Sequence, residues 1–196
     1  MTTDIVDQIV GVTPELDALR RRRPVTREQL QASFDALFAP VSTEEVSQAE
    51  RELIAAFATR LAGDEDATGT FYADRALAVD PQRGAVVIAE AADAAVTGPF
   101  GSYTEVGLQA ENTEGARYTP SAEVSGALGE RLAAALVHTH LLVFRPRESS
   151  ADHIQRLVDA GWSADGIVTL SQLVSFLAFQ QRVITGLTAL QKGIAA

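Results

Sequence analysis

Apolar residues recur at helical spacing along most of the 196-residue chain, and nowhere do β-branched residues alternate with polar ones over the length of a strand. Proline, glycine and capping residues divide this pattern into separate helical segments. The spacing predicts a short helix over 4–10, a second that starts at Thr13-Pro14-Glu15, and a third from Thr26 to about Pro40. The chain is therefore predicted to be all-α.

The next helix has two possible starts. Ser42 with Glu45 and Ser47 with Glu50 both have the spacing of a capping box, in which a serine and a glutamate three residues later cap each other's backbone N–H groups. Either serine is compatible with the apolar stripe that follows on one helical face, which consists of Leu53, Ile54, Phe57 and Leu61.

Beyond Gly63, which is expected to end that helix, two further helices are predicted over 71–77 and 84–96. The second of these is rich in alanine and valine and carries few charges, so it should be largely buried. The helical pattern is then lost from 97 to 119. A loop of this length in a compact domain usually lines a site, makes contacts or moves.

The C-terminal part of the chain returns to helical spacing over 119–144 and again over 149–161. Ser163 then caps a last helix, which is predicted to run from about 164 to 190. This helix is apolar on nearly every side. Such a pattern indicates either a central position in the fold or a subunit interface.

Composition fits a single domain of 1–196, with an N-terminal helical arm over 1–40 and a helical core over 41–196. The formal net charge of −10 repels nucleic-acid phosphates and anionic lipids, so neither partner is expected. The only basic cluster, Arg20 to Arg23, fits the end of a helix. Acidic residues near Met1 and the lack of a continuous apolar run of about 20 residues predict a cytoplasmic protein without a signal peptide or membrane span.

Histidine and acidic clusters give little support for a metal site. His138 and His140 are two residues apart, so on a regular helix they point in nearly opposite directions. For His138 we expect a hydrogen-bonded core position, with a ligand or acid/base role as the alternative. The acidic run 64–66 lacks the spacing of a calcium loop and is expected to be a solvated turn. Neither a metal nor an organic cofactor is predicted.

Three residues on the helix predicted over 71–77 have side chains suited to chemistry. Tyr72, Asp74 and Arg75 combine an aromatic hydroxyl, an acid and a base on one segment. An Asp–Arg pair is usually a structural ion pair, and an acid/base role is the alternative. Nucleotide-binding and serine-hydrolase motifs are missing from the chain, so neither of those functions has its usual signature.

The chain contains no cysteine, which bears on a resemblance to a known superfamily. The stretch 47–56 resembles the helix before the active site in the alkylhydroperoxidase D-like and carboxymuconolactone decarboxylase superfamily. Segment 159–163, followed by 176–187, resembles the closing helices of its peroxidase-related branch. The stretches 17–24 and 34–38 resemble a cysteine-free branch of carboxymuconolactone decarboxylase-domain proteins. Together the likeness covers most of the chain.

The resemblance locates the missing thiol centre. Counted from Glu52, the two cysteine positions of the peroxidase motif fall on Asp64 and Ala67, and its histidine position falls on Phe71. Only the glutamate is retained. A thiol peroxidase needs a thiolate nucleophile and a proton relay, and neither an aspartate nor a phenylalanine can replace them. Thiol peroxidase activity is therefore excluded.

The resemblance implies an AhpD-like fold built of antiparallel helical hairpins and assembly into dimers, trimers or hexamers. Two functions remain open. One is a non-thiol acid/base enzyme that acts on a small organic acid or lactone. The other is an inactive homologue that serves as an oligomeric scaffold, pairs with a cysteine-containing relative, or binds a small ligand. The candidate catalytic residues for the enzyme are Glu52, Tyr72, Asp74, Arg75 and His138.

Overall fold

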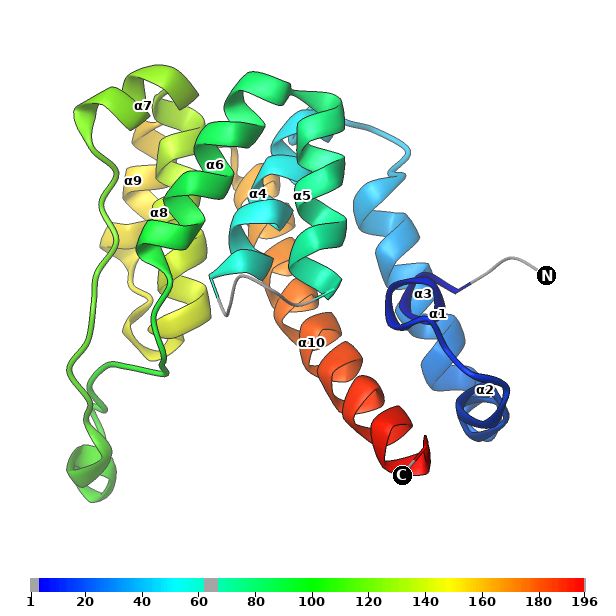
Figure 1. Cartoon of the computed structure of the whole chain (residues 1–196). Coiled ribbons are helices and arrows are strands. Elements are labelled where there is room, and N and C mark those ends of the chain that lie inside the picture. The colour runs from blue at the N-terminus through cyan, green and yellow to red at the C-terminus, as the bar shows by residue number, and fades with distance from the viewer. Residues whose placement is uncertain (1–3, 62–66, 196) are drawn as a thin grey trace.

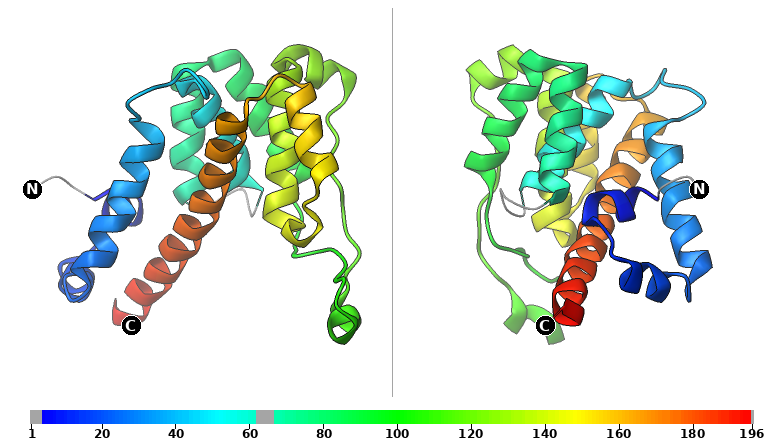
Figure 2. Two further views of the ribbon diagram at one scale, coloured as in Figure 1. Left: turned by 180° about the vertical axis from the view of Figure 1, so that it is seen from behind. Right: turned by 45° about the vertical axis from the view of Figure 1, so that its right-hand side comes forward.

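The computed structural model describes residues 4–61 and 67–195. Within these ranges the chain is all-α, with ten α-helices, two 3-10 helices and no strand beyond one isolated bridge. Figure 1 shows the helices arranged around the long C-terminal helix α10, which separates the first three helices from α8 and α9 in the view from behind (Figure 2). The prediction of an all-α chain is confirmed for the described residues.

The N-terminal arm folds as three helices whose starts are set by local capping. The Asp4 carboxylate accepts hydrogen bonds from the first N–H groups of α1, and Gly11 ends that helix with a φ of 65°. Thr13 caps α2. The third helix begins earlier than the predicted Thr26, because Pro24 occupies its first turn. The three helices are α1 (Ile5–Val10), α2 (Pro14–Arg20) and α3 (Pro24–Phe38).

A central helical hairpin follows the arm. Of the two predicted starts, Ser47 is the one used: its side chain and that of Glu50 form the complete capping box. The predicted stripe of four apolar residues is fully buried, and α4 packs against α5, α6, α8 and α10. Gly63, the predicted end, lies outside the described residues. The hairpin and the helix after it are α4 (Gln48–Arg60), α5 (Ala67–Val79) and α6 (Pro81–Ala94).

Two predictions about the middle of the chain are wrong. Helix α6 buries one stripe rather than most of its surface, because it lies at the outside of the helical body. The segment 119–144 is two helices that meet at an angle of 115°. Gly129 causes the break, since its φ of 82° lies outside the helical range. The two helices are α7 (Ala122–Leu128) and α8 (Glu130–Phe144).

Residues 97–119 form an excursion that we call the projecting loop. It extends beyond the helical body in both views of Figure 2 and carries a short 3-10 helix, η1 (Val106–Glu111), at its tip. A second 3-10 helix, η2 (Pro146–Glu148), precedes α9 (Ala151–Asp159). The prediction of a long segment without α-helix over 97–119 is thus confirmed.

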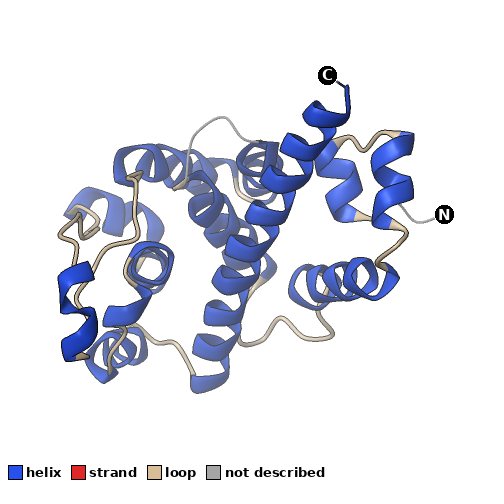
Figure 3. Ribbon diagram, turned by 90° about the horizontal axis from the view of Figure 1, so that it is seen from below, coloured by secondary structure: helices blue, strands red, loops and turns tan. Residues whose placement is uncertain are grey.

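The last helix, α10 (Ala164–Ala195), starts where predicted, with the Ser163 hydroxyl accepting the Gly166 N–H at 3.0 Å. Its first half lies at the centre of the fold, where Leu170, Leu173 and Leu177 are buried. Its second half extends past the helical body and packs on the N-terminal arm, as the view from below shows (Figure 3). The predicted central position therefore holds for one half of the helix.

The apolar character of α10 bears on the expectation that no segment of the chain spans a membrane. Residues 164–194 are long and apolar enough, by length and composition, to cross a membrane, because the mean hydropathy of their most apolar part is 1.3 despite scattered serines, threonines and glutamines. In the most apolar part of this stretch, 28% of the residues are buried inside the fold. Most of this part of the helix is therefore exposed or only partly buried, and Phe179 and Leu190 are its exposed large apolar side chains.

Candidate functional site

Three of the five predicted catalytic residues meet between α4 and α5. The Glu52 carboxylate accepts a hydrogen bond from Arg75 Nε at 2.8 Å, another from a terminal nitrogen of Arg75, and a third from Gln48 Nε2 at 2.6 Å. The Tyr72 hydroxyl donates to Gln180 Oε1 on α10 at 2.6 Å. Tyr72 and Arg75 lie three residues apart on α5, so both face the same side of the helix.

Aromatic rings enclose this ion pair. The Arg75 guanidinium lies 5.4 to 5.6 Å from the centres of three phenylalanine rings, those of Phe34, Phe38 and Phe71. Glu52 is buried and Tyr72 is fully buried. Hydrogen bonding to Glu52 raises the pKa of Arg75, and burial raises the pKa of the Tyr72 phenol well above its ordinary value. Arg75 therefore stays charged and Tyr72 stays neutral at neutral pH.

The other two predicted catalytic residues lie elsewhere. Asp74 is exposed on the outer side of α5, because a residue two positions from Tyr72 faces away from it. His138 is buried on α8, with Nε2 3.1 Å from the Ser171 hydroxyl of α10, as expected for a hydrogen-bonded core histidine. The structure thus brings Glu52, Tyr72 and Arg75 together and separates the remaining two from them.

His138 borders a pocket of about 440 Å³ between α8 and α9, which His153 also lines. Burial, together with the nearby His153, lowers the pKa of His138 to about 4, so its ring is neutral at neutral pH. His140 points elsewhere: its ring packs between Tyr118 and Phe144. The opposite directions expected for His138 and His140 are confirmed.

The positions implied by the missing thiol centre carry no reactive group among the described residues. Ala67 is the first residue of α5 and is exposed. Phe71 is half-buried and packs edge-on against Tyr72, with ring centres 5.0 Å apart. Asp64 and the rest of the acidic run lie outside the described residues. Glu52 therefore has an arginine partner on α5, one turn beyond the position where the resemblance implies a histidine.

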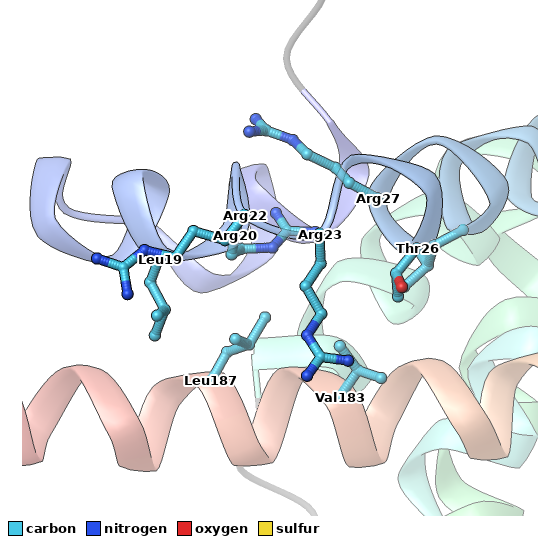
Figure 4. Close-up of a pocket in the computed structure, with 9 residues that line it drawn as sticks. Leu19, Arg20, Arg22, Arg23, Thr26, Arg27, Val183 and Leu187 are labelled. Carbon is cyan, nitrogen blue, oxygen red and sulfur yellow. The ribbon is translucent and has the colours of Figure 1, made fainter.

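A larger open groove lies between the N-terminal arm and the second half of α10. We call it the arginine groove, and its volume is about 630 Å³, within the range of small-ligand sites. Its apolar floor consists of Leu19 and Leu30 from the arm and of Val183 and Leu187 from α10. In Figure 4 the leucine and valine side chains of α10 face the arm across this space.

Four arginines border the groove, and two of them are already neutralised. Arg20 pairs with Asp4 at 3.4 Å and with Asp7, and Arg27 pairs with Asp17 at 2.8 Å and also with Asp7. These ion pairs join α1, α2 and α3 to one another. They therefore account for the fold of the arm and leave Arg20 and Arg27 with little charge to offer a ligand.

Arg22 and Arg23 are different, because neither has an ion-pair partner among the residues that the structure describes. Both lie in the turn between α2 and α3 and are exposed. Figure 4 shows the Arg23 side chain extending from this turn towards α10, close to Val183. The groove thus combines two unpaired positive charges with an apolar floor, although the whole chain has a net charge of −10.

The groove is held open by polar contacts between its two walls. Gln191 of α10 accepts a hydrogen bond from the Thr13 N–H at 3.0 Å and donates to the Gly11 carbonyl at 3.2 Å. A small second core of Ile5, Val6, Leu30 and Ile184 lies beside it. The arm and α10 therefore form a fixed frame around the groove.

Comparison with known proteins adds no relative. No protein-family model matches this chain, and no curated protein sequence matches it. The superfamily resemblance of the sequence accordingly stays a prediction.

Proposed function

We propose that the protein is a binding protein whose site is the arginine groove, and that it takes an organic anion with an apolar body. The observation that carries the proposal is that Arg22 and Arg23 border an apolar floor and have no ion-pair partner within 4–61 and 67–195. Arginine donates hydrogen bonds in a planar fork that matches a carboxylate. The floor offers a surface on which a hydrocarbon chain or ring loses contact with water.

The acid/base enzyme is the weaker candidate, because its residues are bound to one another. The Glu52 carboxylate accepts three internal hydrogen bonds, and the Tyr72 hydroxyl is bound to Gln180 in the core. A general base needs a lone pair that a substrate can reach. The Glu52 side chain is only 5% exposed, so a substrate has little access to its carboxylate.

The proposal is compatible with the superfamily resemblance of the sequence. The hairpin of α4 and α5, with Glu52 buried inside it, is compatible with an AhpD-like fold that has lost its thiol centre. In this proposal the protein is an oligomeric, cytoplasmic binding protein, and a cysteine-containing relative is its further partner. Helix α10 is proposed to be a core and interface helix rather than a membrane span, since α3, α4, α8 and α9 all pack against it.

Calorimetric titration with sodium octanoate tests the function, because octanoate joins one carboxylate to a short apolar chain. We expect octanoate to bind, the double variant Arg22→Gln/Arg23→Gln to bind at least ten-fold more weakly, and 1-octanol to bind at least ten-fold more weakly than octanoate to the wild type. Arg156→Gln is the matched control, because it removes another exposed arginine, on α9 and on the other side of α10; Arg156 borders the pocket between α8 and α9, so this variant also shows whether octanoate binds there instead.

Two results would overturn the proposal. The first is octanoate binding that is equal in the wild type and in the Arg22→Gln/Arg23→Gln variant. The second is turnover of an organic acid or a lactone that Glu52→Gln abolishes while the fold is retained. The second result would establish the acid/base enzyme instead.

A further inference from the structure

The projecting loop is firmly anchored at its base. The Phe100 N–H donates to the Phe144 carbonyl at 2.7 Å, and Gly101 pairs with Thr113 through two backbone hydrogen bonds of 2.8 and 3.2 Å. Arg145 Nη1 donates to the Gly115 carbonyl at 2.8 Å. The end of α8 and the two sides of the loop therefore hold one another in a fixed direction.

At the tip of the loop, by contrast, the apolar side chains are exposed. Val106 is 85% exposed and Leu108 is 41% exposed, although both belong to the ordered turn of η1. Glu105 and Glu111 flank them and form no ion pair with any residue that the structure describes. The tip is thus a pair of apolar side chains between two free carboxylates.

The tip and the arginine groove have complementary chemistry. The groove offers two free guanidiniums above an apolar floor, and the tip offers two free carboxylates beside apolar side chains. Burying Val106 and Leu108 against the groove floor removes apolar surface from water on both partners. Arg22 and Arg23 would then face the carboxylates of the tip. The rest of this net-acidic protein would repel those carboxylates.

The positions of the two features favour a second copy as the source of the tip. Figures 1 and 2 place the loop tip, the turn between α2 and α3 and the second half of α10 at the same end of the molecule, with the loop and the N-terminal arm on opposite sides of α10. The arginine groove is lined by that turn and by α10. The loop of one chain is therefore directed away from its own groove. A second copy facing the first end to end, related by a two-fold axis between tip and groove, brings each tip to the other copy's groove.

Building on the proposed function of the arginine groove, we infer that the protein forms a two-fold dimer in which the projecting-loop tip of each chain fills the arginine groove of the other. Two identical contacts form at once, so neither groove nor tip remains open. The site is closed by assembly, and an organic anion of the octanoate kind competes with the loop for it.

Charge reversal on the two sides tests the inference. The groove-reversed variant is Arg22→Glu/Arg23→Glu, and the loop-reversed variant is Glu105→Lys/Glu111→Lys. Light scattering after size-exclusion chromatography should give twice the monomer mass for the wild type and the monomer mass for each variant alone. In an equimolar mixture both contacts pair opposite charges again, so a dimer with one copy of each variant should form. Native mass spectrometry identifies that mixed dimer.

A matched control makes the same change of charge as the loop-reversed variant, but at two other positions on the surface. Glu44→Lys/Glu123→Lys alters two exposed glutamates away from the loop tip and should stay dimeric. Circular dichroism of each variant checks that it is folded. A monomeric wild type, a dimer that survives both reversals, or a mixture of the folded variants that stays monomeric would each overturn the inference.

Octanoate binding by the loop-reversed variant distinguishes a failure of this inference from a failure of the proposed function. The loop-reversed variant keeps its groove intact and vacant, so it should bind octanoate at least as tightly as the wild type. If it does so while charge reversal leaves the oligomeric state unchanged, the dimer is wrong and the small-ligand function stands. If assembly follows the charge swap but octanoate does not bind to this variant, the dimer stands and the small-ligand function is wrong.

Discussion

Replacing Arg75 by alanine is expected to destabilise the fold by about 3 kcal/mol. The Glu52 side chain is only 5% exposed, whereas that of Arg75 is 34% exposed. Truncation removes both Arg75 hydrogen bonds and leaves the buried carboxylate with the single donor of Gln48. Loss of one partner from a buried pair costs about 3–5 kcal/mol. The lower end applies here, because water can enter where the partly exposed arginine was.

Glu52→Gln should cost less, about 1–2 kcal/mol, although it breaks the same ion pair. The amide has the shape of the carboxylate and keeps an oxygen that accepts a hydrogen bond from Arg75. The Arg75 guanidinium is partly in water and close to three phenylalanine rings, so neutralising its partner costs it less stabilising free energy than the buried Glu52 carboxylate loses without Arg75. The predicted order of the two losses follows directly from the different exposure of the two side chains.

Urea unfolding followed by fluorescence measures both losses. Trp162 is the single tryptophan of the chain, and it is buried with its indole N–H donating to the Arg131 carbonyl at 2.9 Å. A larger loss for Glu52→Gln than for Arg75→Ala would refute the reasoning.

Two further predictions concern stability and use the same urea assay. Gly129→Ala should cost about 1–3 kcal/mol, because the backbone there has a φ of 82° and a ψ of 150°, whereas Gly126→Ala, at a helical site with open space, should be neutral or stabilising. Burial lowers the pKa of His138 to about 4, so between pH 6.5 and 4 the unfolded chain binds the proton more readily than the folded one. Stability should therefore fall by roughly 3 kcal/mol as the pH drops through this window and should level off below it. His138→Gln should remove that fall and His153→Gln should retain it; equal profiles for the two variants would contradict the assignment.

Helix boundaries were predictable where a nearby side chain or a proline sets them. Asp4, Ser47 and Ser163 cap their helices through contacts within three residues, which the sequence displays directly. Gly126 and Gly129 show where this information ends. The first is an ordinary helical residue and the second breaks the helix by 115°. The two glycines look alike in sequence, because the packing of distant segments decides between their backbone conformations.

The candidate residues divide in the same way. Tyr72 and Arg75 share a face of α5 because they are three positions apart, and this spacing also predicts that Asp74 faces away. Their partner Glu52 could be anticipated only through the superfamily resemblance. The contact of His138 with Ser171 joins two helices that are far apart along the chain, and no local pattern encodes it.

The arginine groove could not be predicted from the sequence, because it also depends on contacts between distant segments. The sequence shows the run Arg20–Arg23, but its pattern predicts only the end of a helix. In the fold Asp4, Asp7 and Asp17 neutralise Arg20 and Arg27, whereas Arg22 and Arg23 form no ion pair with any residue that the structure describes. The apolar floor joins the arm to a part of α10 more than 150 residues later in the chain. A charge pattern becomes a binding site only when the fold decides which charges remain unpaired.

The charge of the whole chain limits what such a groove can bind. An anion approaching a protein of net charge −10 is repelled at long range, and the Debye length of about 8 Å at physiological salt confines the attraction of Arg22 and Arg23 to short distances. A small inorganic anion gains only that short-range attraction. A ligand that also covers the apolar floor gains the burial of Val183 and Leu187 in addition. The groove should therefore discriminate by the apolar part of its partner, and both octanoate and the tip of the projecting loop supply such a part beside a carboxylate.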